Sequence, residues 1–242
     1  MQFAPLILTV LVVAACGAPA QTDKPMALLS DTPTGMILDE IPDTVDPGRR
    51  YLLYLHNRFA EHAQPSDRHP TFGVYDLRGI LEAFAERRFI VIAAQREPGA
   101  DPARWATRVA GQVKRLMAAG VSPENIAVVG FSKGGAIAIL TSSKLADDRV
   151  NFVFLAACGE WTDRVPGLQP RGRLLSITEA SDDMAGTCGR LFSMAIDGTI
   201  HEEIEVRLGG GHGAFFTPQP EWIEPAAAWA SGKFHRHPKT GP

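Results

Sequence analysis

The sequence predicts an α/β fold, in which a mostly parallel β-sheet is covered by helices on both faces. Two observations support this prediction. Short, continuously apolar segments recur along the chain, and amphipathic segments with helical spacing separate most of them. Strands buried on both faces are apolar throughout, and helices connect the successive strands of a parallel sheet. The 242 residues, 45% hydrophobic and 21% charged, suit one domain of this kind.

The first 20 residues differ from the rest of the chain. PLILTVLVVAAC (residues 5–16) is apolar, too short to span a bilayer and ends in small residues, which is typical of a signal peptide. Its last four residues also resemble the cleavage box of bacterial lipoproteins, although no Lys or Arg precedes Lys24. We expect residues 1–20 to be a lipoprotein-type signal peptide, with lipidated Cys16 anchoring an exported, periplasmic or outer-membrane protein. Simple cleavage and secretion is the alternative.

A linker follows this segment. Residues 21–48 are rich in Pro, Thr and Asp, and only GMILDEI (residues 35–41) resembles a strand. We therefore expect a linker that ends in one edge strand. The globular domain then covers residues 49–235, and residues 236–242 form a polar tail.

Six further segments are predicted to be strands, and most of them have the apolar character of buried strands. They span residues 50–56, 89–94, 126–130, 151–157, 173–178 and 202–208. Only about 15 residues separate the fourth segment from the fifth. No large cap domain fits in that interval, so we expect a site that is largely open to solvent.

Five segments are predicted to be helices. In the first, residues 77–88, the apolar face is formed by Leu77, Ile80, Leu81 and Phe84. The second, residues 101–120, begins with Asp101 as its N-cap and has a proline at the first helical position. Its apolar face is formed by Trp105, Val109, Val113 and Leu116. The other three helices are expected at residues 133–145, 185–196 and 219–231.

The sequence GFSKG, with Ser132 at its centre, joins the strand at residues 126–130 to the helix at residues 133–145. A G-x-S-x-G sequence between a strand and a helix is typical of a nucleophile elbow, where a strained backbone projects the serine hydroxyl above the sheet edge. The helix N-terminus also favours an oxyanion nearby. A phosphate-binding loop would need G-x-x-x-x-G-K-[S/T] or G-x-G-x-x-G, and neither occurs at the matching strands. The placement of the motif therefore favours a serine nucleophile.

A serine nucleophile needs a general base, and the base needs an acid that orients it. In a sheet of this kind both follow later strands, in the chain order Ser, Asp, His. Asp182 and Asp183 come just after the strand at residues 173–178, and His212 lies in a glycine-rich loop after the strand at residues 202–208. Counting from the strand end favours Asp182 as the orienting acid, with Asp183 as the alternative.

From YLLYLH to GGGHG (residues 51–213), the chain resembles the α/β-hydrolase fold superfamily, in particular its compact, single-domain dienelactone hydrolases and carboxylesterases. The resemblance implies a serine hydrolase that uses no cofactor. It also implies an oxyanion hole formed by two backbone N–H groups, one from Lys133 and one from Arg58 in the loop after the first buried strand. This chain departs from the family pattern at Asn57, where glycine is usual, and the departure leaves the geometry of that loop to be tested.

Two arginines are candidates for binding the substrate. Arg58 and Arg96 both lie in loops at the expected active edge, where either could clamp a carboxylate or a phosphate. The alternative is an exposed arginine paired with Glu61 or Glu97. We expect the side chain of Lys133 to be solvated.

Two cysteines remain if Cys16 is lipidated. Cys158 and Cys188 can pair in an oxidising compartment. A disulfide closing a loop of this length stabilises a fold by about 3 to 4 kcal/mol in the chain-entropy model. The alternative is two buried free thiols.

The residues taken together predict a serine hydrolase that acts on a small ester or thioester. The alternatives are a peptidase or amidase of the same fold, and a non-catalytic exported binding protein on the same scaffold. A net charge of −3 gives no electrostatic case for nucleic acid as a partner. We expect no metal, because serine hydrolysis needs none and three of the other histidines show no metal-ligand spacing: His56, His62 and His69. The sequence does not define an oligomeric state.

Overall fold

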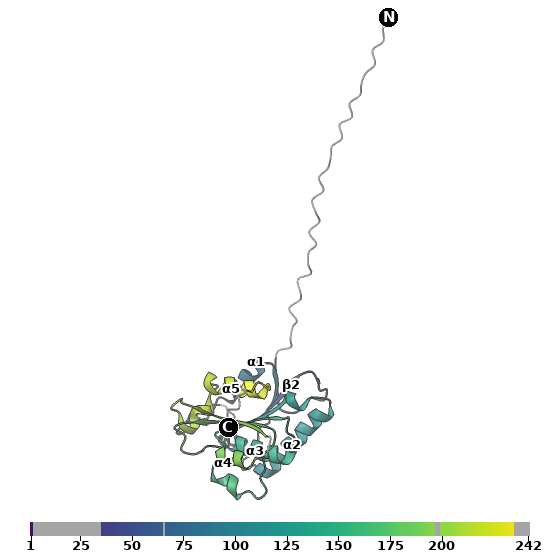
Figure 1. The fold of residues 1–242 in the computed structure, drawn as a ribbon. Helices are drawn as coiled ribbons and strands as arrows, with labels where there is room; N and C mark the ends of the chain where they lie inside the picture. The colour runs from purple at the N-terminus through teal and green to yellow at the C-terminus, as the bar shows by residue number, and fades with distance from the viewer. Residues whose placement is uncertain (2–34, 65, 197–198, 235–242) are drawn as a thin grey trace. The chain divides into compact units, whose positions relative to one another are not determined.

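Seven parallel strands form the central sheet of the protein. A computed structural model (Figure 1) describes residue 1 and residues 35–64, 66–196 and 199–234. The strand order is β1-β5-β2-β6-β7-β8-β9, and all neighbouring strands run parallel. The strands are β1 (Met36–Leu38), β2 (Arg50–Leu55), β5 (Phe89–Ile92), β6 (Ile126–Phe131), β7 (Asn151–Leu155), β8 (Arg173–Glu179) and β9 (Ile200–Val206). The predicted fold class is confirmed.

The position of each strand in the sheet explains its composition. β5, β6 and β7 are buried along their whole length, and β2 is buried after its first residue. β9 lies at one edge of the sheet, and only its last residue is fully buried. β1 forms the other edge, as expected for the strand that ends the linker.

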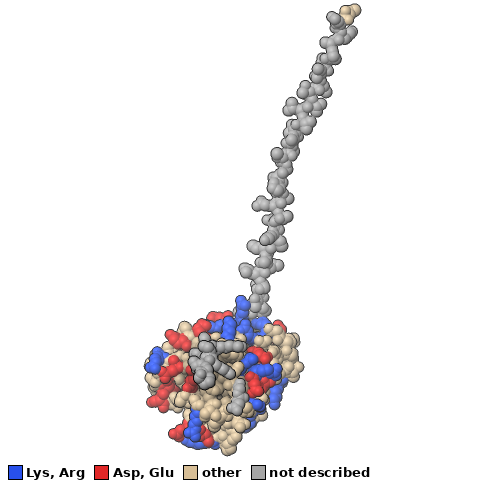
Figure 2. All heavy atoms as spheres, viewed as in Figure 1, with Lys and Arg blue, Asp and Glu red and all other residues tan. Residues whose placement is uncertain are grey.

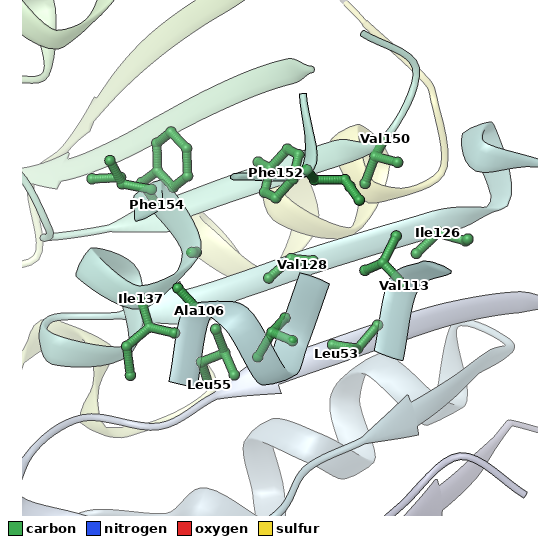
Figure 3. Close-up of a cluster of buried hydrophobic side chains, with 14 of the residues drawn as sticks. Leu53, Leu55, Ala106, Val113, Ile126, Val128, Ile137, Val150, Phe152 and Phe154 are labelled. Carbon is green, nitrogen blue, oxygen red and sulfur yellow. The ribbon is translucent and has the colours of Figure 1, made fainter. Parts of the chain in front are cut away.

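Helices cover both faces of the sheet, as predicted. α1 (Leu77–Glu86) and α5 (Pro220–Ala230) pack on one face, and α2 (Pro102–Ala118), α3 (Lys133–Leu145) and α4 (Gly189–Ser193) pack on the other (Figure 1). Alternate residues of one strand therefore enter two different cores. Leu53 and Leu55 point toward the cluster that α2 and α3 complete (Figure 3), whereas Leu52 and Tyr54 belong to the opposite cluster.

The N-termini of the first two helices are capped by aspartates. Asp76 Oδ1 accepts a hydrogen bond from the backbone N–H of Gly79 at 2.9 Å, and Asp101 Oδ1 accepts one from Arg104 at 2.7 Å. Each bond satisfies one of the N–H groups that a helix leaves unpaired at its start. The predicted N-cap at Asp101 is confirmed.

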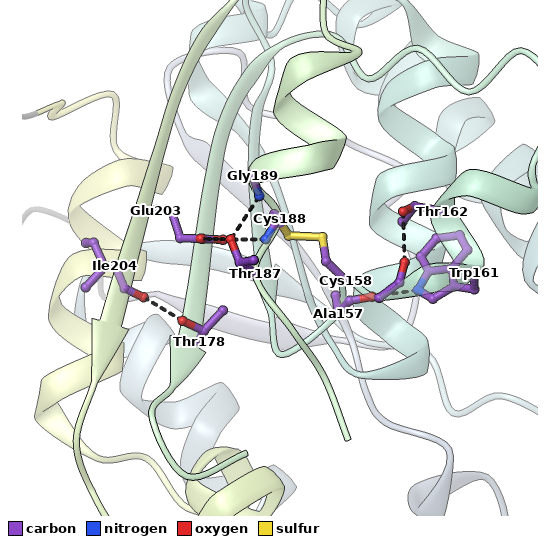
Figure 4. The surroundings of a disulfide bond; sticks show 11 residues. Ala157, Cys158, Trp161, Thr162, Thr178, Thr187, Cys188, Gly189, Glu203 and Ile204 are labelled. Carbon is purple, nitrogen blue, oxygen red and sulfur yellow. Dashed lines mark hydrogen bonds between the residues drawn. A yellow bond between two sulfur atoms is a disulfide. The ribbon is translucent and has the colours of Figure 1, made fainter. Parts of the chain in front are cut away.

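The helix predicted at residues 185–196 is wrong in its extent, because only Gly189–Ser193 is helical. Gly186 instead pairs with Cys158 in an antiparallel bridge, where its N–H donates to the Cys158 carbonyl at 3.0 Å. A disulfide joins Cys158 to Cys188 across 5.2 Å between their Cα atoms (Figure 4). The bridge and the disulfide hold this segment in an extended path until α4 begins.

The long connection between β2 and α1 has structure of its own that the sequence patterns did not indicate. It contains a 3₁₀ turn, η1 (Phe59–Glu61), and a short antiparallel hairpin of β3 (Arg68–His69) and β4 (Gly73–Val74). Both strands of the hairpin are too short to give a periodic signal. The other 3₁₀ turns are η2 (Pro123–Asn125), η3 (Glu160–Arg164) and η4 (Gly211–Phe216).

Several predictions concern residues outside the described part of the chain. Cys16, all but the first residue of the expected signal peptide, the first half of residues 21–48 and the polar tail at residues 236–242 all lie there. Contacts divide the chain into Met1–Thr32 and Pro33–Pro242, and the sheet lies within the second unit. Among the described residues, no helix has the length and apolar character needed to cross a membrane. Lys and Arg side chains occur together with Asp and Glu on the surface drawn in Figure 2.

Candidate active site

The residues predicted to carry the chemistry follow four different strands. Arg58 comes after β2, Ser132 directly after β6, Asp182 after β8 and His212 after β9. Because all strands are parallel, their carboxyl ends lie at the same edge of the sheet. Residues more than a hundred positions apart are therefore brought to one edge.

The backbone at Ser132 is strained in the way an elbow requires. Ser132 has φ 54° and ψ −118°, in the region that L-residues rarely adopt. A Cβ atom at Gly130 would collide with the backbone of Gly134, and one at Gly134 would collide with the carbonyl oxygen of Leu55. The Ser132 N–H donates to the Leu155 carbonyl at 2.9 Å, which holds the turn against β7. The two glycines of the motif are therefore required by close packing between strand and helix.

Two hydrogen bonds connect the serine, the histidine and one aspartate. His212 Nε2 lies 2.8 Å from Ser132 Oγ, and His212 Nδ1 lies 2.8 Å from Asp182 Oδ2. A carboxylate oxygen can only accept, so Nδ1 carries the proton and Nε2 accepts from the serine hydroxyl. This tautomer is the one in which a histidine can remove the proton of a serine.

Asp182, and not Asp183, is the acid in contact with the histidine. Asp182 Oδ1 also accepts hydrogen bonds from the backbone N–H groups of Met184 at 2.8 Å and Ala185 at 3.2 Å. Burial raises the pKa of Asp182, but the hydrogen bonds from His212 and from the backbone outweigh it, so the pKa lies below its usual value. Asp183 is exposed to solvent. Asp182 is thus held as a carboxylate.

A second buried carboxylate, which the sequence patterns did not single out, joins the aspartate loop to the histidine loop. Glu179 accepts hydrogen bonds from the backbone N–H groups of Leu208 at 3.1 Å and Gly209 at 3.0 Å. It also accepts from the N–H of Ser181 at 2.7 Å, and the Ser181 hydroxyl accepts from Gly211 N–H at 3.1 Å. Burial raises the pKa of Glu179, yet these donors lower it below the usual value overall. The signal in the sequence that could have identified Glu179 is its position directly after the predicted apolar strand, at the end of β8.

Aromatic rings surround the histidine. The Phe131 ring lies 5.1 Å from the His212 ring, and the Phe72 ring lies 6.1 Å away, measured between centroids. Phe72 comes from the turn of the β3–β4 hairpin, and a Cβ atom at Gly213 would lie 2.8 Å from it. The hairpin therefore packs directly against the histidine loop, and the site is more covered than the sequence predicted.

The loop after β2 accommodates Asn57 without a positive φ. The Asn57 carbonyl accepts hydrogen bonds from His56 Nδ1 at 2.8 Å and from Arg96 Nη2 at 3.1 Å, and Arg96 Nη2 also donates to the His56 carbonyl. In a trans peptide the N–H of the next residue points opposite to the carbonyl. The Arg58 N–H therefore points away from the Arg96 guanidinium, and no residue that the structure describes accepts a hydrogen bond from it.

Arg96 is not positioned to bind a substrate, so that prediction is wrong. Arg96 is 1% exposed, and its Nε donates to Glu61 Oε1 at 3.1 Å. The second oxygen of Glu61 accepts from Lys133 Nζ at 2.8 Å, so the side chain of Lys133 is not solvated as expected. Glu61, in the loop after β2, therefore contacts the residue that follows the serine. Sequence separations of 35 and 72 residues left no local pattern that could predict these contacts.

The groups of this buried network have shifted pKa values. Burial raises the pKa of Glu61, but the hydrogen bonds from Lys133 and Arg96 outweigh it and the net shift is downward. Burial, followed by the charge of Arg96, lowers the pKa of His56 to about 4. Since His56 Nε2 accepts the Arg96 N–H at 3.0 Å while Nδ1 donates, the ring is held neutral.

The side chain of Arg58 is exposed, unlike that of Arg96. It lines a cavity of about 660 Å³ together with Lys133 and four other residues: His62, Pro98, Gly99 and Pro102. Within the described part of the chain, no group of three or more His, Cys, Asp or Glu residues could hold a metal ion.

Comparison with known proteins identifies the fold. No family model and no curated protein matches the sequence. The solved structure of SOBER1 from Arabidopsis thaliana is 15% identical, covering 77% of this chain and 99% of that one, with a TM-score of 0.53. Esterase PE8 is 16% identical, covering 80% of this chain and 97% of that one, also with a TM-score of 0.53. Together with the seven-stranded parallel sheet, these similarities show that the chain has the α/β-hydrolase fold.

Proposed function

We propose that the protein is a serine hydrolase that cleaves a small ester or thioester through an acyl-enzyme. One observation carries the proposal: Ser132, at a backbone turn of positive φ, donates to His212, which in turn donates to Asp182, each across 2.8 Å. The similar solved structure named as an esterase is in accord with it. A shared fold alone would not indicate the chemistry.

Acylation begins with attack on the substrate. Ser132 Oγ forms a bond to the carbonyl carbon while its proton moves to His212 Nε2, and the carbonyl oxygen becomes an oxyanion. Asp182 stabilises the imidazolium that forms. The C–O or C–S bond to the leaving group then breaks, and Nε2 delivers its proton to the departing alcohol or thiol. The product of this half-reaction is an ester of Ser132.

The oxyanion needs donors that are already in place. Lys133 is the first residue of α3, and the first N–H groups of a helix have no hydrogen-bond acceptor within that helix. Arg58 N–H is the second donor that we propose, since the Asn57 carbonyl is fixed on the opposite side of the peptide. Each such donor contributes roughly 3 to 4 kcal/mol to the stability of the transition state.

Deacylation uses the same groups in reverse. A water molecule gives a proton to His212 Nε2 and its oxygen attacks the acyl carbon. The second tetrahedral intermediate collapses when the bond to Ser132 Oγ breaks, and Nε2 returns its proton to the serine. The products are a carboxylic acid and the free enzyme, so no redox step or cofactor enters the balance.

We also propose that the protein works in an oxidising compartment after export. The Cys158–Cys188 disulfide supports this, because disulfides persist outside the reducing cytosol. Lipidation at Cys16 remains a proposal from the sequence. Intact-mass measurement of the protein from a membrane fraction would test it, and an unmodified, soluble mature chain would contradict it.

The test of the hydrolase proposal is labelling of the full-length protein with a fluorophosphonate, followed by peptide mapping. We expect one adduct on Ser132, and loss of that adduct in Ser132→Ala and His212→Ala. Ser193→Ala is the matched control, since Ser193 is exposed and donates only to the Arg190 carbonyl at 2.7 Å. A panel of esters, thioesters and amides then identifies the bond that is cleaved.

A folded protein that takes up no fluorophosphonate and hydrolyses none of the panel would overturn the proposal. The non-catalytic binding protein would then be the better description. Turnover of amides alone would instead make the protein a peptidase or amidase of this fold.

A further inference from the structure

A cavity opens beside the candidate active site, and its polar lining is basic. The cavity measures about 660 Å³, which is within the usual range for small-molecule sites. Three of its lining residues carry nitrogen donors at the ends of their side chains: Arg58, His62 and Lys133. Among the described residues that line it, none is acidic.

The ion pairs of the basic residues that line the cavity do not neutralise all of their positive charge. Glu61 is the carboxylate nearest to Lys133, but its side chain is 0% exposed and it is shared with Arg96. Arginine keeps its proton in proteins, so two cations face one carboxylate and one positive charge is left over. Arg58 adds a second, because its exposed side chain forms no ion pair with any residue that the structure describes.

The cavity borders two residues close to the candidate reacting centre, because Lys133 directly follows Ser132 and Arg58 lies in the loop after β2. Its two basic side chains, Arg58 and Lys133, belong to the residues whose backbone N–H groups we propose as oxyanion donors. Either the acyl group or the leaving group of a substrate bound at Ser132 could thus extend into the cavity. Lys133 also stands at the N-terminus of α3, where the helix dipole favours negative charge.

We propose that this cavity binds an anionic group of the substrate, a carboxylate or a phosphate, so that the enzyme prefers esters that carry a negative charge close to the scissile bond. The inference rests on the proposed function and narrows its substrate class. Arg58 supplies the planar pair of donors that carboxylate and phosphate oxygens match. Lys133 supplies a point charge that Glu61 holds in place.

The first experiment compares matched esters in solution. Monomethyl succinate is compared with methyl valerate, which places the charge on the acyl side. Two further charged esters carry the charge on the leaving group: potassium 4-acetoxybenzoate carries a carboxylate, and 4-acetoxyphenyl phosphate carries a phosphate. Both are compared with neutral 4-tolyl acetate, and with each other. We expect kcat/KM to favour the charged member of at least one pair by about 10-fold or more, the effect of one charge-assisted hydrogen bond. The preference should shrink as salt rises from 0.05 to about 0.5 M.

Variants of Arg58 test whether this side chain is responsible. In Arg58→Gln the ratio of charged to neutral kcat/KM should fall toward 1, leaving only the share that Lys133 supplies, while Arg58→Lys should keep more of it because the charge remains. Arg115→Gln is the control with the same change of charge. Arg115 is exposed in the last turn of α2, about 20 Å along the helix from Pro102, which lines the cavity. Its ratio should equal that of the unmodified enzyme.

Binding to Ser132→Ala separates this inference from the hydrolase proposal, because that variant can bind an ester without turning it over. We expect calorimetry to give a lower Kd for monomethyl succinate or 4-acetoxybenzoate than for the neutral partner, and Arg58→Gln added to Ser132→Ala should reduce this difference. If Ser132 is labelled and neutral esters are cleaved equally well, the enzyme stands and the anionic subsite is refuted. If no ester is cleaved but the charged esters bind more tightly than the neutral ones, the anionic subsite is supported and the hydrolase proposal is refuted.

Discussion

Two polar clusters meet at the turn between Ser132 and Lys133, and they differ in almost every physical respect. On one side, Ser132 contacts His212 and Asp182, and the serine is only half-buried. On the other side, Lys133 contacts Glu61, which Arg96 holds from within the protein. The first cluster contains groups that can exchange a proton, whereas the second contains permanent charges.

The two histidines are both buried, and they differ in the hydrogen-bond partners of their ring nitrogens. In the first cluster a proton can move from oxygen to nitrogen, because His212 Nε2 faces the Ser132 hydroxyl at 2.8 Å and can accept from it. In the second, His56 has both ring nitrogens occupied and a pKa of about 4, so it does not take up a proton near neutral pH. His212 is therefore placed to accept the serine proton, whereas His56 holds a loop.

The largest expected effect breaks the reactive cluster at its acid. Asp182→Asn should lower kcat by about 10⁴-fold, because an amide can donate to His212 Nδ1 and stabilise the wrong tautomer. Asp183→Asn is the matched control at the neighbouring, exposed position, and its kcat should change by less than about 3-fold. Steady-state hydrolysis of an aryl ester measures both. Equal losses in the two variants would refute the assignment of Asp182.

The next effect breaks the supporting cluster. Arg96→Met leaves Glu61 with one cation and removes the donors to the His56 and Asn57 carbonyls. We expect a loss of about 3 to 5 kcal/mol in the free energy of unfolding, as is typical when one partner of a buried ion pair is removed. The protein that remains folded should also lose kcat, by about 10²- to 10³-fold, if Arg58 N–H is an oxyanion donor.

Arg78→Met is the control for this substitution. The Arg78 side chain is 86% exposed and pairs with Glu82 one turn away on α1, so its loss should cost less than about 0.5 kcal/mol. Urea unfolding monitored by tryptophan fluorescence gives both values. A similar midpoint for the two variants would show that the Glu61 network contributes nothing to stability.

The sequence predicted the reactive cluster far better than the supporting one. GFSKG and the order of Ser132, Asp182 and His212 are local signals, each tied to the end of a recognisable strand. Arg96 was visible only as a charged residue after a strand, and nothing local distinguishes a buried arginine from an exposed one. Its burial depends on Glu61 and on two carbonyl groups that only the folded chain brings together.

The same contrast applies to the fold. Continuous apolar strands and amphipathic helices are periodic patterns that a sequence displays directly, and they predicted the parallel sheet and both helical layers. The β3–β4 hairpin has strands of two residues each, too short for a period, and it covers the histidine loop through Phe72. Helical character around Cys188 was overestimated because the disulfide and the bridge to Cys158 act over 30 residues.

A smaller effect should appear as the pH is lowered, and it distinguishes the two histidines. The folded-state pKa of His56 is about 4 and its unfolded value is about 6.5, so the unfolded chain binds more protons between these values. Stability is therefore greatest above pH 6.5 and falls through this window, by about 3 kcal/mol in total at 1.36 kcal/mol per unit. Urea midpoints measured between pH 7 and 4 follow it. His56→Gln should be less stable at pH 7 but show a flatter dependence; an unchanged slope would contradict the buried, neutral state of His56.

The smallest effect is expected when a buried carboxylate beside the Ser132 cluster, Glu179, is replaced, and it is compared with the loss of Glu61 in the Lys133 cluster. Glu179 faces neutral backbone N–H groups, whereas Glu61 faces two cations. Glu179→Gln keeps an oxygen that can accept from some of those donors, so we expect a loss of about 1 to 3 kcal/mol. Glu61→Gln leaves buried Arg96 and partly buried Lys133 without their shared counter-charge and should cost more. Glu179 connects the loop of Asp182 to the loop of His212, so Glu179→Gln should also have a lower kcat with little change in KM. Fluorophosphonate should still label Ser132 in this variant. A larger loss of unfolding free energy in Glu179→Gln than in Glu61→Gln would contradict this expectation. It would mean that hydrogen bonds from backbone N–H groups stabilise a buried carboxylate here more than its cationic partners do.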